Sequence, residues 1–145
     1  MASSTTACVV DASFVVGLLQ PGRPEIVDLW QAWMDDGSRV HAPTLLLFEV
    51  TNALYRIGRA MKASPMVLTA SLEELDQLDL ELTADIPLAR RAGELAWGLD
   101  LPAAYDAHYL ALAERLGATL WTCDEKLARR VVGHRPRIRV SVPAA

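Results

Sequence analysis

Cysteine, long apolar runs and positive charge are scarce in this sequence, and each shortage excludes a class of protein. Two cysteines in 145 residues, Cys8 and Cys123, cannot form a disulfide framework, and no His or Cys lies at the spacing of a structural zinc site. Both fall in or beside predicted strands, so we expect buried free thiols in a reducing compartment.

No apolar stretch approaches the roughly 20 residues that span a bilayer. The leader MASSTTA lacks the basic region and the apolar region of a secretory signal. We therefore expect a cytoplasmic protein that has no membrane partner.

The net charge of −4 argues against a general attraction to nucleic acid, but the charges are unevenly distributed. Residues 1–85 contain 12 acidic and 5 basic residues, whereas residues 86–145 contain 6 acidic and 9 basic residues. Six of the basic residues lie in residues 126–139. This segment is either a solvated surface or a rim that contacts the phosphates of a polyanionic substrate.

The chain has the length of one domain, residues 1–145, and its 52% of hydrophobic residues can fill a sizeable core. Short apolar runs alternate with segments of helical periodicity in the order β-α-α-β-α-α-β-α-α-β-α-β. This order predicts an α/β fold in which helices cover both faces of a parallel sheet. The expected strands are residues 7–11, 39–43, 78–83, 118–122 and 137–142, the last at an edge. The helices with predicted bounds are residues 25–36, 44–60 (capped by Thr44), 64–78 (capped by Ser64), 86–98, 104–116 and 124–131.

Four acidic residues interrupt otherwise apolar segments: Asp11, Glu49, Asp106 and Asp124. Asp11 ends the first strand and Asp124 follows the fourth. Glu49 lies about one and a half turns into its helix, and Asp106 lies in the first turn of its own. In such a sheet the ligand site lies outside the carboxyl ends of the strands, where the strand order reverses. Carboxylates are rare in apolar surroundings unless they are paired or bound to a cation, so we predict that all four share one site.

Four carboxylates without a convergent His or Cys favour Mg²⁺ or Mn²⁺ over zinc or copper. Mg²⁺ keeps several waters and takes substrate phosphates as further ligands, which makes phosphodiester hydrolysis the natural reaction. Single residues have structural alternatives, because Asp106 and Asp124 could each cap or charge-match the N-terminus of a helix. Glu49 is harder to explain in this way, since its neighbours in sequence are apolar.

Three motifs carry these acids: V-V-D-A-S, then L-x-x-E-x-x-N-A-L, then Y-D-A-x-Y-L-A-L-A-x-x-L-G-A-x-L-x-T-x-D. Together they resemble a PIN domain, and within that family the VapC-type ribonuclease toxins of bacterial toxin–antitoxin modules. The resemblance covers residues 7–142, and its last motif is the most specific. It implies a three-layer αβα fold with a five-stranded parallel sheet, and Mg²⁺- or Mn²⁺-dependent cleavage of RNA.

The resemblance also implies roles for individual residues. The quartet of catalytic and metal-binding residues consists of Asp11, Glu49, Asp106 and Asp124. Ser13 and Thr122 match accessory hydroxyls that orient ligands or waters, and Asn52 matches a polar position that serves either packing or hydrogen bonding. The candidate RNA contacts in the basic segment are Lys126, Arg129 and Arg130. A toxin must be held inactive in its own cell, so a cognate antitoxin, a homodimer, or both are expected. The aliphatic residue usual in the fourth strand is replaced by Trp121.

Other classes fit less well. A response-regulator receiver needs an acidic pair before the first strand's Asp, and a haloacid-dehalogenase-type phosphatase needs D-x-D where this chain has Asp11-Ala12-Ser13. A PIN-like binding module without catalysis is the remaining alternative, which a metal titration with and without RNA would separate from an enzyme. Trp30, Trp33 and Met34 belong either to the core or to the wall of a partner-binding groove.

Overall fold

The computed structural model describes residues 6–134 and 138–144. Its elements follow the order predicted from the sequence. They are β1 (Ala7–Val10), α1 (Ala12–Leu19), α2 (Pro24–Asp36), β2 (Arg39–Pro43), α3 (Leu45–Ala60), α4 (Pro65–Gln77), β3 (Leu80–Thr83), α5 (Ile86–Gly98), α6 (Tyr105–Leu116), β4 (Thr119–Trp121), α7 (Glu125–His134) and β5 (Val140–Ser141).

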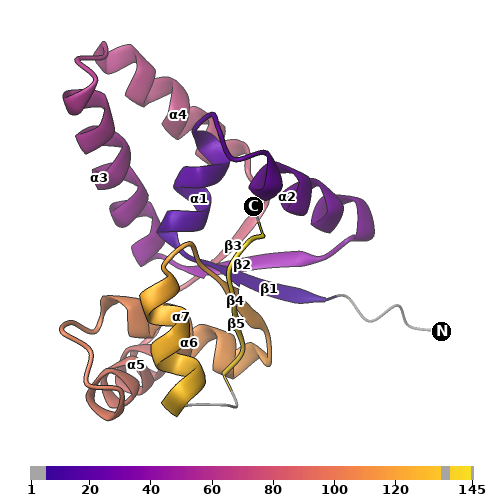
Figure 1. Cartoon of the computed structure of the whole chain (residues 1–145), viewed down its shortest axis with the longest axis vertical. Coiled ribbons are helices and arrows are strands. Elements are labelled where there is room, and N and C mark those ends of the chain that lie inside the picture. Colours follow the sequence, from indigo (N-terminus) through magenta and orange to yellow (C-terminus); the bar gives the residue numbers. More distant parts are fainter. Residues whose placement is uncertain (1–5, 135–137, 145) are drawn as a thin grey trace.

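The strands form one five-stranded sheet in the order β3-β2-β1-β4-β5, and every neighbouring pair is parallel. Helices α1 to α4 lie on one side of the sheet and α5 to α7 on the other (Figure 1). The predicted three-layer αβα architecture is therefore confirmed. The strand order reverses between β1 and β4, so these two strands mark the switch point.

The switch point is fixed by the register of β1 and β4, which pairs Val9 with Leu120 and Val10 with Trp121. One residue further on, the backbone N–H of Asp11 donates to the carbonyl of Trp121 at 3.2 Å. Asp11 and Thr122 consequently leave the sheet side by side. Because parallel strands end at the same edge, Asp11 and Thr122 are neighbours at the site although they are 111 positions apart in sequence.

Several predicted bounds need correction. The last strand is shorter than residues 137–142, although it does lie at an edge, and its predicted first residue, Arg137, is outside the described residues, as are residues 1–5 of the leader. Thr44 does not cap α3 with its side chain, because its own backbone is already helical, with φ −59° and ψ −21°. Ser64 does cap α4, since its hydroxyl accepts from the N–H of Met66.

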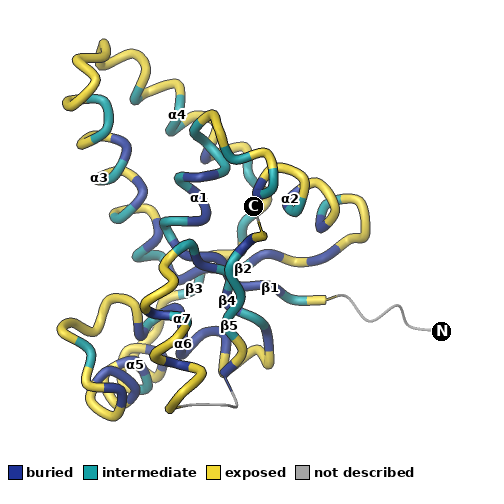
Figure 2. Tube along the Cα trace, viewed as in Figure 1, coloured by how far each residue is buried: buried dark blue, intermediate teal, exposed yellow. Residues whose placement is uncertain are grey.

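Aromatic side chains pack the layer between the sheet and α2. The ring of Trp33 stacks on Phe14 at a centroid distance of 5.4 Å, and its edge contacts include Trp121 at 5.5 Å. Trp30 and Trp33 are both buried, so of the two uses considered for them, core and groove wall, the structure supports the core. Figure 2 shows the burial concentrated along the central strands and the inward sides of the helices.

Both cysteines are free, as predicted, but the predicted burial holds only for Cys8, whereas Cys123 is half-buried. Burial raises the pKa of the Cys8 thiol to about 11. Within residues 6–134 and 138–144, no helix has the length and the apolar composition that crossing a membrane requires.

Replacing Trp33 with Ala is expected to lower the free energy of unfolding by about 3–5 kcal/mol, because the buried ring leaves a cavity beside Phe14 and Trp121. Urea denaturation followed by circular dichroism measures this loss. The matched control is Trp97→Ala, since the side chain of Trp97 is 91% exposed and should change stability by less than about 0.5 kcal/mol. Equal losses in the two variants would contradict the assignment of Trp33 to the core.

Candidate active site

Asp11 is the most deeply placed of the four acids. Its side chain is 6% exposed and lies between the end of β1 and the start of α1. The Ser13 hydroxyl donates to Oδ1 at 2.6 Å, the N–H of Phe14 donates to the same oxygen at 3.1 Å, and the Thr122 hydroxyl donates to Oδ2. Burial raises the pKa of Asp11, these three hydrogen bonds oppose the rise, and the charge of Glu49 adds to it.

The two hydroxyls that hold Asp11 are themselves held by the chain after β4. The N–H of Cys123 donates to the Ser13 hydroxyl at 2.9 Å, and the N–H of Asp124 donates to the Thr122 hydroxyl at 3.0 Å. Ser13 and Thr122 thus connect the ends of β1 and β4 through side chains as well as backbone. Their geometry is that of groups which orient a carboxylate.

Asp106 and Asp124 stand at the beginnings of helices on the opposite side of the sheet from α1. The side chain of Asp124 accepts from the N–H of Leu127 at 3.1 Å. Asp124 therefore caps α7, as the sequence had allowed. Asp106 lies in the first turn of α6. Both are exposed, and both line one hollow with a volume of about 390 Å³.

Glu49 approaches the same place from α3, about one turn after the start of that helix. Its Oε1 accepts a hydrogen bond of 2.6 Å from the hydroxyl of Tyr109, which belongs to α6. Tyr109 is 1% exposed. Burial raises its pKa well above the usual range, and the hydrogen bond to Glu49 and the charges of Glu49, Asp11 and Asp106 raise it further.

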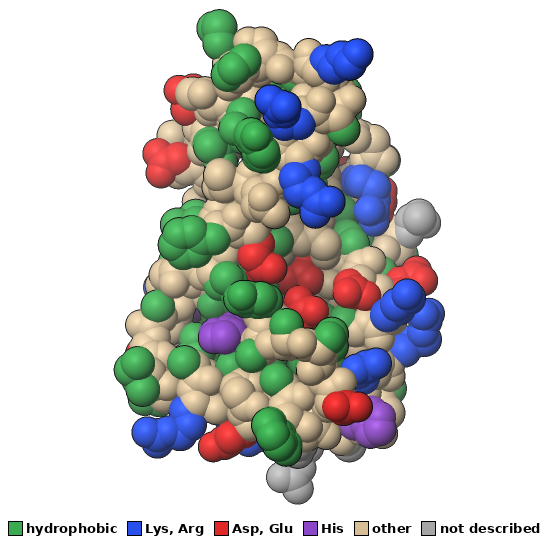
Figure 3. Space-filling model, turned by 90° about the vertical axis from the view of Figure 1, so that its left-hand side faces the viewer, with side chains coloured by type: hydrophobic (Ala, Val, Ile, Leu, Met, Phe, Trp, Pro, Cys, Tyr) green, Lys and Arg blue, Asp and Glu red, His purple; other side chains and the backbone are tan. Residues whose placement is uncertain are grey.

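The pKa of Asp106 depends on the other three acids of the quartet. It is raised to about 6, mainly by partial burial of the carboxyl and then by the charges of Asp11, Glu49 and Asp124, although the residue as a whole is exposed to solvent. One face of the molecule accordingly shows acidic side chains gathered around a hollow at its middle (Figure 3). Such a concentration of like charge attracts cations.

The chemistry of these donors fits Mg²⁺ or Mn²⁺, since all are carboxylate oxygens. Among residues 6–134 and 138–144, however, no group of three or more His, Cys, Asp or Glu side chains is arranged to hold a metal ion. A hydrated Mg²⁺ needs only one or two direct carboxylates, with waters and substrate phosphates as the other ligands. The acidic cluster is compatible with such an ion without being a closed cage.

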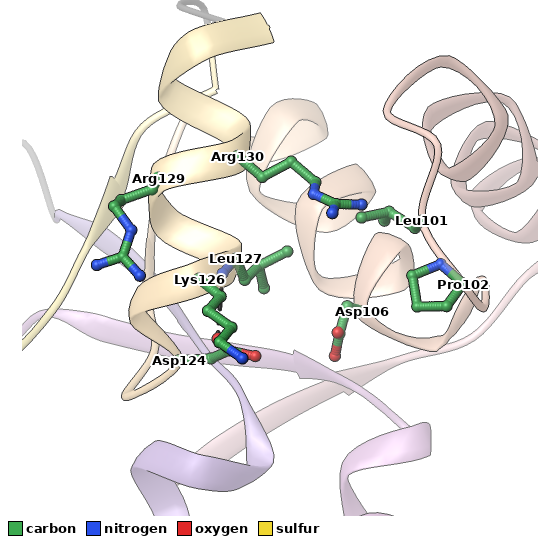
Figure 4. Close-up of a pocket in the computed structure, with 8 residues that line it drawn as sticks. All are labelled: Leu101, Pro102, Asp106, Asp124, Lys126, Leu127, Arg129 and Arg130. Atoms are coloured by element: carbon green, nitrogen blue, oxygen red, sulfur yellow. Dashed lines mark hydrogen bonds between the residues drawn. The ribbon is translucent and has the colours of Figure 1, made fainter.

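Basic residues of α7 border the hollow that contains Asp106 and Asp124. Lys126, Arg129 and Arg130 all line it, and Arg129 and Arg130 extend from opposite sides of the helix (Figure 4). The Arg130 guanidinium donates to the carbonyl of Asp100 at 2.8 Å and thereby ties α7 to the loop before α6. The contact of Arg129 with Glu125 is long, at 3.8 Å, and both side chains are 71% exposed.

Two residues have surroundings that the sequence did not indicate. Asn52, predicted as an accessory residue, lines a separate hollow on the outer side of α3 together with Phe48 and Tyr55. Tyr109 belongs to the last motif without an assigned role, yet it contacts Glu49 directly. The available signal was its spacing: three residues after Asp106, it lies on the same side of α6.

Replacing Asp106 with Asn is expected to stabilise the metal-free protein at pH 7.5 and to lose that advantage as the pH falls. An acid whose folded-state pKa is raised, here from 3.8 to about 6, favours folding below the lower value, and this contribution disappears as the pH rises through the upper one. Thermal unfolding in EDTA between pH 4 and pH 8 measures the difference. Asp28→Asn, an exposed carboxylate on α2, is the control; a pH-independent difference for Asp106→Asn would contradict the shift.

The chain matches the family described as "PIN domain" over residues 8–132. It is similar to "Ribonuclease VapC3" of Mycobacterium tuberculosis, with 38% identity over 130 residues that cover 83% of this chain and 85% of the relative. "Ribonuclease VapC3" of Pyrobaculum aerophilum is 30% identical over 126 residues, which cover 84% of this chain and 92% of the relative.

Solved structures show the same fold at lower identity. VapBC2 from Rickettsia felis, bound to a DNA fragment from its promoter, has a TM-score of 0.71 at 14% identity and covers 94% of this chain and 98% of that chain. A toxin–antitoxin complex from Klebsiella pneumoniae has a TM-score of 0.67 at 18% identity, with the same coverage. From the family match and the two relatives of at least 30% identity, this chain belongs to the PIN domain family and, within it, to the VapC type.

Proposed function

We propose that this protein is a Mg²⁺- or Mn²⁺-dependent endoribonuclease that hydrolyses RNA phosphodiesters, and that it is the toxin of a type II toxin–antitoxin system. The observation that supports this best is the approach of four carboxylates from separate elements to one sheet edge, at the switch point of strand order. The relatives called ribonucleases support the reaction class. Residues 1–145 would act as one cytoplasmic PIN-like domain.

In this proposal the metal is held by Asp11, Glu49, Asp106 and Asp124, directly or through water. A bound Mg²⁺ or Mn²⁺ supplies positive charge for the phosphate and lowers the pKa of a water molecule. The protein supplies orientation: the Ser13 and Thr122 hydroxyls fix both oxygens of Asp11. Pre-oriented ligands reduce the reorganisation needed when substrate binds.

The basic side chains of α7 would contact the RNA backbone beside the metal. Lys126 and Arg129 are exposed at the border of the acidic hollow, where they can approach a phosphate chain. Arg130 is partly engaged by the Asp100 carbonyl, so its first role is to hold the loop wall of the hollow. Local basic residues of this kind offset the net charge of −4, which disfavours RNA elsewhere on the surface.

The proposed partners are a cognate antitoxin and a second copy of this chain. The similar solved structures include a toxin–antitoxin complex, which supports the first. Exposed apolar side chains lie on α3, α4 and the turn between them, among them Tyr55, Met61 and Val67, and these three line a hollow of about 420 Å³. We place the antitoxin there, because contiguous exposed apolar surface is typical of a protein interface.

Removing Asp11, Glu49 or Asp106 is expected to abolish RNA cleavage, and removing Asp11 is expected to abolish the metal response as well. Millimolar Mn²⁺ should raise the melting temperature of the wild type, because binding to the folded state stabilises it, and should leave Asp11→Asn unchanged. Cleavage of a mixed RNA pool should fall by more than about 100-fold in Asp11→Asn, Glu49→Gln and Asp106→Asn. Asp124→Asn should keep partial activity, since water can replace one ligand.

The exposed carboxylate variant Asp28→Asn serves as the control and should match the wild type in both measurements. Equal Mn²⁺ shifts in the wild type and Asp11→Asn would refute the shared site. Wild-type protein that binds Mn²⁺ and RNA but leaves RNA intact would favour the binding module without catalysis.

Replacing Arg129 with Ala is expected to weaken RNA binding and to reduce its salt dependence. Each phosphate contact to a single strand contributes about 0.7 to the slope of log affinity against log salt, so the slope should fall by about that amount. Binding is measured by fluorescence anisotropy with Asp106→Asn protein, which does not consume the RNA.

Mn²⁺ binding to the otherwise wild-type protein should survive Arg129→Ala, because Arg129 is not a ligand. Arg59→Ala, an exposed charge near the end of α3, is the matched control. An unchanged dissociation constant and salt slope for Arg129→Ala would support the solvated-surface interpretation of the basic segment.

A further inference from the structure

The hydrogen bond between Tyr109 and Glu49 joins helices from opposite layers of the protein. Glu49 belongs to α3, on one side of the sheet, and Tyr109 to α6, on the other (Figure 1). The two side chains meet at the carboxyl edge, with 2.6 Å between the phenolic oxygen and Oε1. Since an ionised carboxylate only accepts, the hydroxyl is the donor.

Packing alone does not require a hydroxyl at this position. The other buried residues of α6 near it, Ala107, Leu110, Ala111 and Leu112, are apolar, and a Phe ring would occupy nearly the same volume as Tyr109. Burying a hydroxyl costs free energy unless it finds a hydrogen-bond partner. The hydroxyl of Tyr109 donates to Glu49. Beyond packing, the hydroxyl therefore contributes this hydrogen bond to the carboxylate.

Glu49 needs a hydrogen-bond donor to fix its position, because its flexibility and the neighbouring negative charges favour other orientations of the side chain. It is half-buried on a side chain with three rotatable bonds, and its charge interacts unfavourably with those of Asp11 and Asp106. Without a donor on the cluster side, the carboxylate gains by turning towards water. One accepted hydrogen bond leaves the other acceptor positions of a carboxylate available to a cation.

We propose that Tyr109 is a positioning residue, which holds the Glu49 carboxylate inside the acidic cluster so that it is oriented towards a divalent cation. This inference rests on the proposed function, in which Glu49 is a metal ligand. It adds a residue from the α5–α7 layer to the support of a ligand from the α1–α4 layer. The same hydrogen bond connects α3 to α6 at the site.

The test removes only the hydroxyl, with the variant Tyr109→Phe. Mn²⁺ affinity, measured by isothermal titration calorimetry, should weaken by about 10-fold or more, as for other groups that orient metal ligands. RNA cleavage should fall by a similar factor at low Mn²⁺ and recover at saturating Mn²⁺, because the defect lies in ligand placement. Tyr105→Phe, on the same helix but 62% exposed, is the matched control and should behave as the wild type.

A second comparison separates positioning from a merely structural role. In a Glu49→Ala background, Tyr109→Phe should cause no further loss of Mn²⁺ affinity, since its effect passes through Glu49. Unchanged Mn²⁺ affinity in Tyr109→Phe, or the same loss in both backgrounds, would overturn the positioning role while leaving the proposed function intact. Wild-type protein that binds no Mn²⁺ would overturn the proposed function and this inference with it.

Discussion

The buried carboxylate of Asp11 is the interaction on which the site depends. Burial of a negative charge is unfavourable, and here it is offset by donors from Ser13, Thr122 and the backbone of Phe14. Those donors exist together only where β1 and β4 end side by side. The orientation of the carboxylate therefore depends on both the register of the sheet and the start of α1. A shift of one residue in β4 would move Thr122 away from the carboxylate and break its hydrogen bond.

Three helix N-termini converge on this point and reduce the cost of the accumulated charge. Asp11 caps α1, Asp124 caps α7, and Asp106 lies in the first turn of α6. The positive end of a helix dipole stabilises a nearby carboxylate, so capping and metal binding are compatible uses of the same residues. Glu49 is different, because it lies within a helix and not at its beginning. Its stabilising partner is a side chain, Tyr109, from across the sheet.

The surface carries chemically distinct regions. The acidic hollow, with its volume of about 390 Å³, is bordered by Lys126 and Arg129, which suits a ligand that combines a cation with phosphate groups. The exposed apolar side chains of α3 and α4 suit a protein partner instead. Because α3 carries Glu49 on one side and Phe48 and Tyr55 on another, a partner bound to this helix would lie close to the acidic site.

Local patterns in the sequence determined the order of elements, the burial of the sheet and the four acids, since hydrophobic periodicity and interrupting charges are properties of short segments. Pairings between distant segments were decided only by the tertiary structure. Trp33 became core because Phe14 and Trp121 lie against it, and Arg130 became a tie to Asp100 because α7 packs near that loop. Tyr109 could not be recognised as the partner of Glu49 from sequence, because 60 residues separate them and the contact exists only once both helices meet at the sheet edge.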